Sequence, residues 1–278
     1  MSRWALACIV ALAFTGAANA QTPVARGDYL VNSIMTCGNC HTPKGPPAAT
    51  AGKDFSGGLT WDEPAFKVTA PNITQDKDTG IGKWTTPQTR KAIVEGIRPD
   101  GVPLAGIMPS AFYGILTNSD AGAIVAYVET LAPVKNKVAD PIYKMAVDRK
   151  PFPGTEKPYL PADLRDPVKR GFYLVSIGHC MECHTPMTRG QLEFDKIGTG
   201  GREFPGPWGV SKSRNITSHK DKGIGGWTDD QIKAAITQGK SKDGSPLKGP
   251  MGYQYYAKMT DADISAVIAY LRTVPAKE

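Results

Sequence analysis

A seven-residue string occurs twice in this chain in nearly the same form, and this repetition constrains the fold more than any other feature. CGNCHTP occupies residues 37–43, and CMECHTP occupies residues 180–186. Two cysteines separated by two residues and followed at once by a histidine fit three chemistries: a redox dithiol, half of a zinc site, or a covalent haem anchor. The surrounding sequence has to decide among them.

The repetition extends far beyond the cysteines, at a constant offset of 143 residues. N-I-T at residues 72–74 returns at 215–217, and G-I-G at 80–82 returns at 223–225. Other matched pairs are Trp84 and Trp227, Asp100 and Asp243, Met108 and Met251, and Tyr127 and Tyr270. We infer two copies of one module, at residues 21–132 and 168–278, rather than a solenoid, whose units are shorter and more numerous.

The N-terminal 20 residues predict a secretory signal peptide. Arg3 precedes an apolar stretch from Trp4 to Phe14, and small residues in an A-x-A pattern end at Ala20. The apolar stretch is too short to cross a bilayer, which takes about 20 residues, and no later stretch comes close. We therefore expect an exported, periplasmic protein that begins at Gln21 and has no transmembrane segment.

The predicted modules are mainly α-helical. Helix N-caps are expected at Thr85, Thr117, Thr228 and Thr260, the first and third within T-x-x-Q capping boxes. The helices after the capping boxes should end near Gly96 and Gly239, and a third helix should run from near Arg26 or Lys169 towards each cysteine pair. No convincing strand pattern of period two is present. Residues 133–167 contain seven prolines, which exclude a long helix and predict an extended linker that packs along both modules.

The choice of chemistry depends on the cysteine count and on the loops. Loss of the signal peptide removes Cys8, so the remaining cysteines are Cys37, Cys40, Cys180 and Cys183. Zinc would need a second ligand pair at short range, and a thioredoxin-like dithiol would need a βαβ context; neither is present. Long loops rich in Gly and Pro leave each module with a thin core unless a large apolar cofactor fills it. Haem attached to each C-x-x-C-H string uses all four cysteines and supplies the large apolar group that would fill each core.

Each iron would then have two protein ligands. His41 and His184 are placed to bind from the proximal side, and Met108 and Met251 each lie 67 residues beyond their histidine. The matched spacing separates these methionines from the others, which we expect to fill core space.

His179 and His219 are rival ligands for the second iron, but we expect both to be exposed histidines. For the two recurring tryptophans, core packing and a hydrogen bond to a haem propionate both remain open.

With these residues in place, the chain resembles bacterial di-haem cytochromes c, and more narrowly the multi-haem cytochrome c subunits of membrane-bound alcohol and gluconate dehydrogenases. The resemblance implies two tandem class I cytochrome c domains and two covalently attached haems c. It also implies that the first and last helices of each module cross, so that Gly27 meets Tyr127 and Gly171 meets Tyr270. Such subunits commonly carry three haem modules and a C-terminal amphipathic anchor. This chain shows two modules and no such anchor, which favours a soluble or detachable form with at most peripheral membrane association.

These features predict an electron carrier rather than an enzyme. The formal charge of +7 comes from scattered residues without a dense basic block, so we expect no nucleic-acid partner. Redox proteins, namely a dehydrogenase as donor and an oxidase or cytochrome as acceptor, are the expected partners. The alternative is a haem enzyme, a peroxidase or sulfur-compound oxidoreductase, with one open or labile iron site.

Overall fold

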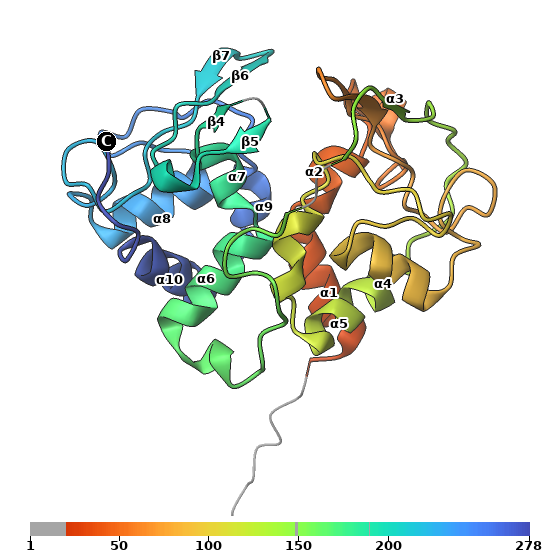
Figure 1. Ribbon diagram of the computed structural model, residues 1–278, viewed down its shortest axis with the longest axis horizontal. Coiled ribbons are helices and arrows are strands. Elements are labelled where there is room, and N and C mark those ends of the chain that lie inside the picture. Colours follow the sequence, from red (N-terminus) through yellow and green to blue (C-terminus); the bar gives the residue numbers. More distant parts are fainter. Residues whose placement is uncertain (1–20, 148–149, 189) are drawn as a thin grey trace, which may run out of the picture.

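A computed structural model describes residues 21–147, 150–188 and 190–278, so the expected signal peptide lies outside the described residues. Each module is built on one pair of packed helices (Figure 1). In the first module, α1 (Pro23–Asn32) packs against α5 (Asn118–Val128). In the second, α6 (Pro167–Ile177) packs against α10 (Asp261–Leu271).

Both helix pairs cross at a glycine because no side chain fits between the helices. A Cβ atom on Gly27 would lie 2.0 Å from the carbonyl oxygen of Ala123 and 2.7 Å from Cβ of Tyr127. In the second module, a Cβ atom on Gly171 would lie 2.0 Å from the Ala266 oxygen and 2.6 Å from Cβ of Tyr270. The predicted meeting of each glycine with its tyrosine is therefore confirmed.

The predicted helix starts are also confirmed. Thr85 and Thr228 form complete capping boxes and open α4 (Thr86–Val94) and α8 (Asp229–Gln238). Thr117 and Thr260 cap α5 and α10 through their side chains. Each cap satisfies a backbone N–H that would otherwise have no partner in the first turn of the helix.

The expectation of no strands was wrong, although the strands that form are short. The sheet of module 1 contains β1 (Thr60–Asp62), β2 (Phe66–Thr69) and β3 (Ile142–Tyr143), all antiparallel. Module 2 has two hairpins: β4 (Met187–Thr188) with β5 (Gln191–Leu192), and β6 (Glu203–Gly206) with β7 (Gly209–Lys212). These strands have at most one buried residue each and only two to four residues, which is too short for an alternation such as that of Phe66–Thr69 to indicate a strand in the sequence. The remaining short elements are α3 (Pro47–Thr50), η1 (Ser110–Ile115), η2 (Asp163–Arg165), η3 (Phe194–Lys196) and α9 (Tyr253–Tyr256).

The proline-rich segment between the modules contacts both of them. Its strand β3 extends the sheet of module 1, where Ile142 pairs with Lys67. Further along, Phe152 is buried and stacks on Phe112 of module 1, with ring centroids 4.7 Å apart. The same ring meets Phe194 of module 2 edge to face at 5.8 Å. The segment is thus anchored at several points along its path.

The two modules also exchange hydrogen bonds in a reciprocal way. Tyr29 of module 1 donates to Asp263 of module 2 at 2.5 Å, and Tyr173 of module 2 donates to Asp120 of module 1 at 2.6 Å. Each aspartate also pairs with an arginine of its own module: Arg26 with Asp120 at 2.8 Å and Arg170 with Asp263 at 2.6 Å.

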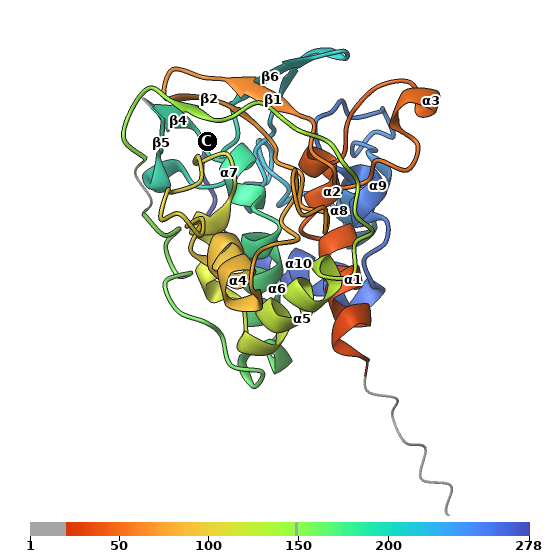
Figure 2. The same ribbon diagram turned by 90° about the vertical axis from the view of Figure 1, so that its right-hand side faces the viewer.

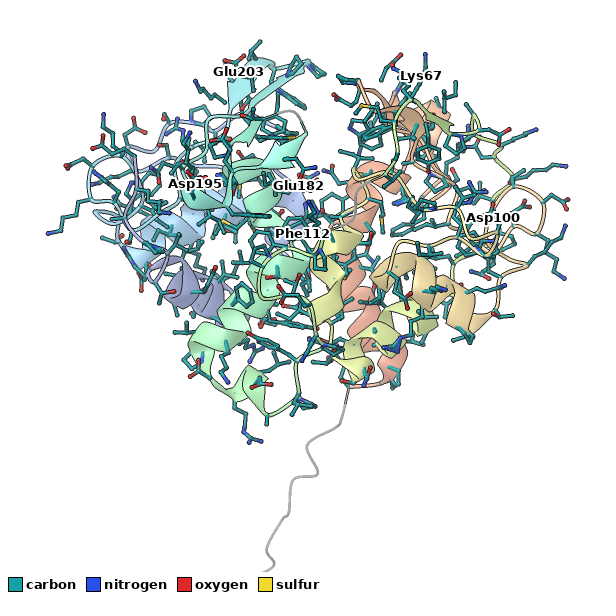
Figure 3. All side chains as sticks on the ribbon, viewed as in Figure 1. Lys67, Asp100, Phe112, Glu182, Asp195 and Glu203 are labelled. Atoms are coloured by element: carbon teal, nitrogen blue, oxygen red, sulfur yellow. The ribbon has the colours of Figure 1, made fainter. Side chains whose placement is uncertain are left out.

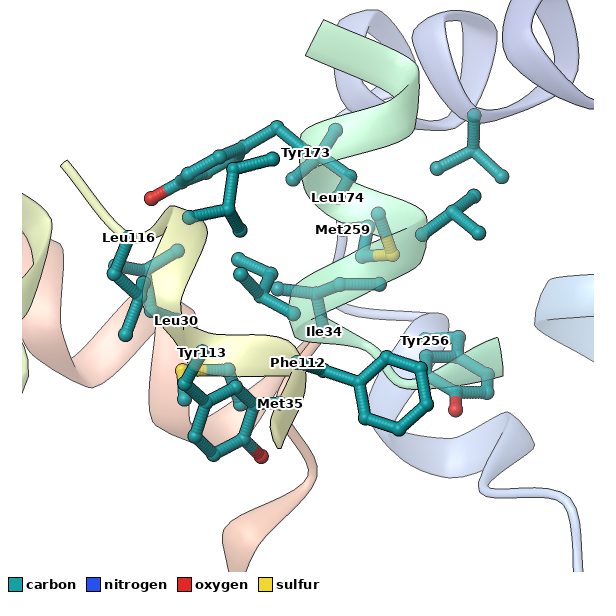
Figure 4. Packing of buried hydrophobic residues seen from close by; sticks show 14 of the residues in the cluster. Leu30, Ile34, Met35, Phe112, Tyr113, Leu116, Tyr173, Leu174, Tyr256 and Met259 are labelled. Carbon is teal, nitrogen blue, oxygen red and sulfur yellow. The ribbon is translucent and has the colours of Figure 1, made fainter. Parts of the chain in front are cut away.

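A single buried apolar cluster continues across this contact. Matched residues from the two copies lie within it: Leu30 with Leu174, Tyr113 with Tyr256, and Leu116 with Met259 (Figure 4). Figures 1 and 2 both show the packed helices at one end of the molecule and the hairpins and long loops at the other. Within the part of the chain that the structure describes, no helix is both long enough and apolar enough to cross a membrane.

Candidate functional site

The two C-x-x-C-H strings each form a single helical turn, α2 (Cys37–His41) and α7 (Cys180–His184). Cysteines three residues apart in a helical turn lie on the same side of it, as attachment to one planar group requires. All four cysteines are free of disulfides and partly exposed. Thr36 and His179, the residues before each turn, have left-handed φ values of 50° and 42°. Two non-glycine residues in this region at equivalent positions indicate a locally constrained backbone.

The histidine that ends each turn is held in the orientation that a metal ligand needs. Nδ1 of His41 lies 2.8 Å from the carbonyl oxygen of Pro71, and Nδ1 of His184 lies 2.7 Å from that of Arg214. A carbonyl can only accept, so Nδ1 carries the proton and Nε2 keeps its lone pair. Burial lowers the pKa of both histidines, and the carbonyl contact opposes this only in part. The neutral imidazole, which is the form that binds metals, is therefore favoured.

The N-I-T segments explain how these carbonyls are positioned. Asn72, directly after Pro71, accepts hydrogen bonds from the backbone and side chain of Thr74 at 2.9 and 2.7 Å. Its amide donates to the carbonyl of Val134, just beyond α5, at 2.7 Å. Asn215 repeats these contacts in module 2, with Lys277 accepting at 2.7 Å. The repeated N-I-T motif is visible in the sequence. The backbone carbonyl that orients each histidine could not be predicted, because no particular side chain marks it.

The glycines of the G-I-G strings allow the next loop to pack closely on this segment. A Cβ atom on Gly82 would lie 2.1 Å from the carbonyl oxygen of Gln75, and one on Gly225 would lie 2.0 Å from that of Ser218. The following tryptophans, Trp84 and Trp227, are partly buried and pack against the apolar core. The packing interpretation is thus supported, and the bond to a propionate stays a prediction.

The protonation of the cysteines argues against a redox dithiol. Burial raises the pKa of Cys37, Cys180 and Cys183 to about 12. Burial also raises the pKa of Cys40 to about 11, and the charge of Glu182 adds to this. Redox-active dithiols have a lowered pKa instead, because the thiolate is the attacking species. Zinc gains no support either, since the described residues contain no group of three or more His, Cys, Asp or Glu side chains arranged to hold a metal ion.

The two candidate methionines occupy matched positions. Met108 follows a loop from α4 and directly precedes η1, while Met251 follows the equivalent loop from α8 and precedes α9. Both side chains are partly exposed and pack against the apolar cluster. The structure thus places both at the edge of the core, and their role as iron ligands stays a prediction.

The rival histidines already have local partners. His179 lies 2.9 Å from Glu182, and Nδ1 of His219 accepts from the backbone of Asp221 and Lys222 at 3.2 and 3.1 Å. His219 thereby closes the turn that Asp76 closes in module 1. The expectation that both histidines are exposed was wrong: each side chain is only 23 % exposed, because these contacts hold it against the protein.

The donor set fits haem c in both modules. Each module offers two protonated thiols on one helical turn, an imidazole with Nε2 available, and a partly exposed thioether at the edge of the core. These residues repeat position by position, and so do the hydrogen bonds that support them.

Comparison with known proteins agrees with this geometry. The Cytochrome c family matches residues 24–132 and again residues 168–275. The gluconate 2-dehydrogenase cytochrome c subunit of Pantoea cypripedii is 30 % identical over 272 residues, which cover 92 % of this chain and 60 % of the relative. The fructose dehydrogenase cytochrome subunit of Gluconobacter japonicus is 33 % identical over 94 % of this chain and 54 % of its own length. A diheme cytochrome c-type protein of Cereibacter sphaeroides is 30 % identical over 87 % of this chain and 83 % of its own length.

This chain therefore spans little more than half of the two dehydrogenase subunits but most of the diheme protein. The two family matches fall on the two structural copies described above. The chain belongs to the cytochrome c family and contains two copies of its domain.

Proposed function

We propose that this chain is an exported electron-transfer protein that carries two haems c, one in each module. Cys37 and Cys40 would attach the first haem and Cys180 and Cys183 the second. His41 and Met108 would be the axial ligands of the first iron, with His184 and Met251 on the second. The observation that carries the proposal is the matched orientation of the two histidines, each with Nδ1 on a backbone carbonyl. A metal-binding histidine is typically fixed in this way.

Bound haem supplies a one-electron iron couple, and the protein fixes its properties. Two axial side chains leave no position for a substrate, which suits a carrier rather than an enzyme, and methionine as sixth ligand raises the reduction potential. The similarity to dehydrogenase cytochrome subunits supports a dehydrogenase as the electron donor, with a downstream cytochrome or oxidase as acceptor. The periplasm is the proposed location, based on the signal-peptide pattern of residues 1–20.

The mass of protein purified from a host that matures c-type cytochromes tests the cofactor. Two attached haems should add two units of about 616 Da to a chain that begins at Gln21, with both thiols of each string consumed. A chain of unmodified mass from such a host would overturn the proposal.

The axial ligands are tested separately. Met108→Ala should keep both haems attached but lose half of the near-infrared sulfur-to-iron band, and it should bind carbon monoxide at one iron. Met145→Ala is the matched control, because Met145 is 62 % exposed and far from core packing. An unchanged spectrum for Met108→Ala would remove Met108 from its role. Binding of carbon monoxide by the unaltered protein would instead favour the alternative of a haem enzyme.

A further inference from the structure

The methionine loop of module 2 touches the attachment turn of module 1. Gly252 directly follows Met251, and Thr36 directly precedes Cys37. A Cβ atom on Gly252 would lie 3.4 Å from Cγ2 and 3.9 Å from Cβ of Thr36. Gly252 is buried and has a φ of −84°, and a methyl group there would meet Thr36 at ordinary van der Waals distance.

A second contact lies one turn further along the same two segments. A Cβ atom on Gly38, inside α2, would lie 3.1 Å from the hydroxyl oxygen of Tyr255 in α9. The equivalent residue in module 2 is Met181, a large side chain. Module 1 thus has glycine, the smallest residue, where the Tyr255 hydroxyl of module 2 packs against α2.

The reverse contact is made with different residues. Helix η1, which follows Met108, packs against α6, the helix that leads to the attachment turn of module 2. Phe112 of η1 and Met181 of α7 belong to the same buried cluster. Figure 3 shows Phe112 of η1 and Glu182 of α7 close to the boundary between the modules. Tyr113 of η1 is buried in the same cluster, against which Cys37 and Cys180 of the two attachment turns also pack.

These contacts join two parts of the molecule that control different cofactors. In each direction, the element that follows one module's methionine rests on the attachment turn of the other module or on the helix that leads to it. The reciprocal tyrosine–aspartate bonds hold the modules in this arrangement. A displacement of the methionine loop of module 2 towards module 1 would therefore press on Thr36 and α2.

We propose that Thr36, Gly252 and Tyr255 are positioning residues that couple the two haem sites across the module contact. A change in the methionine loop of module 2 is transmitted through Thr36 to the turn that holds Cys37 and His41. The coupling rests on the proposed function, because it requires both haems to be attached.

The test is a graded series at Gly252 in the complete, haem-loaded protein. A methyl group at the Cβ position meets Thr36 at ordinary van der Waals distance, so Gly252→Ala should resemble the unaltered protein. Gly252→Leu adds an isobutyl group at a buried position between Thr36 and Tyr255 and should push on Thr36. Gln254→Leu adds the same side chain at an exposed position two residues away and serves as the control.

The measurement is the proton NMR spectrum of the reduced protein, in which an iron-bound methionine gives a shifted methyl resonance. Met108→Ala and Met251→Ala each remove one resonance and so assign the pair. We expect Gly252→Leu to shift the Met108 resonance of module 1 as well as that of Met251, with both unchanged in Gln254→Leu. A shift confined to Met251 would overturn the coupling while leaving the proposed function intact.

A reverse experiment covers the case in which Gly252→Leu does not fold. Thr36→Ala removes the Cγ2 atom that faces Gly252 and adds no bulk. It should shift the Met251 resonance of module 2, although residue 36 belongs to module 1. Thr36→Ala protein with two haems and an unmoved Met251 resonance would contradict the inference, whereas unaltered protein without haem would contradict the proposed function.

Discussion

Removing the hydroxyl of Tyr173 should destabilise the folded protein by about 2–3 kcal/mol, the usual range for a hydrogen bond to a charged group in a buried place. Tyr173 is 1 % exposed, and its hydroxyl donates at 2.6 Å to Asp120, whose side chain is 8 % exposed. Tyr173→Phe leaves that carboxylate oxygen without this donor, and water has little access to replace it. The matched change Tyr29→Phe removes the bond to the buried Asp263 and the acceptor of the Thr260 N–H, so its cost should be of the same order, about 1.5–3 kcal/mol.

The assay is urea unfolding of the haem-loaded protein, followed by far-ultraviolet circular dichroism. Tyr253→Phe is the control, since its hydroxyl donates at 3.0 Å to the neutral carbonyl of Lys248 within one module at an exposed position. We expect the two interface changes to be less than fully independent, because Arg26 pairs with Asp120 and also lies over the Tyr29 ring at 5.5 Å. If Tyr173→Phe costs no more than Tyr253→Phe, the reciprocal bonds do not hold the modules together and the reasoning fails.

Three further outcomes follow from the same structure. Burial, followed by the charge of Asp120, raises the pKa of Tyr173 well above its usual value. The stability that the Tyr173 hydroxyl contributes is therefore complete below about pH 10 and is lost at higher pH. The difference in unfolding free energy between the unaltered protein and Tyr173→Phe should shrink above about pH 10. Gly27→Ala should cost about 3 kcal/mol, because the added methyl group meets backbone at 2.0 Å, whereas Gly122→Ala, on the open side of α5, should stabilise by about 0.5–1 kcal/mol in the same urea titration. Asn72→Ala should lower the unfolding free energy by about 1–3 kcal/mol, and an effect no larger than that of the less buried Asn215→Ala would contradict the role given to burial.

Local signals in the sequence were sufficient for the longer helices, α1, α4, α5, α6, α8 and α10, and for the repeat, but not for the short helices. Thr85 and Thr228 predicted their capping boxes because a cap depends on residues only three positions apart. The crossing at Gly27 followed from the family resemblance and was confirmed by the close approach of Ala123.

Contacts between the copies could not be predicted in the same way. A repeat shows that Tyr29 and Tyr173 are equivalent, but it does not show that each bonds to the aspartate of the other copy. The supporting carbonyl of Pro71 was also missed, because every residue carries a carbonyl and its use depends on the folded backbone. The short hairpins escaped notice because their side chains are mostly exposed and follow no pattern.

The exchange of hydroxyls between the two halves has the form of a two-fold symmetric dimer: Tyr29 meets Asp263, and their counterparts in the other copy, Tyr173 and Asp120, meet in the same way. Two separate subunits joined by such a surface would dissociate on dilution. Here residues 133–167 join the halves in one chain and pack against both, so the contact between them is intramolecular and does not depend on the protein concentration. Tandem duplication has thus converted an association equilibrium into a permanent feature of one polypeptide, and the paired centres stay together however scarce the protein is.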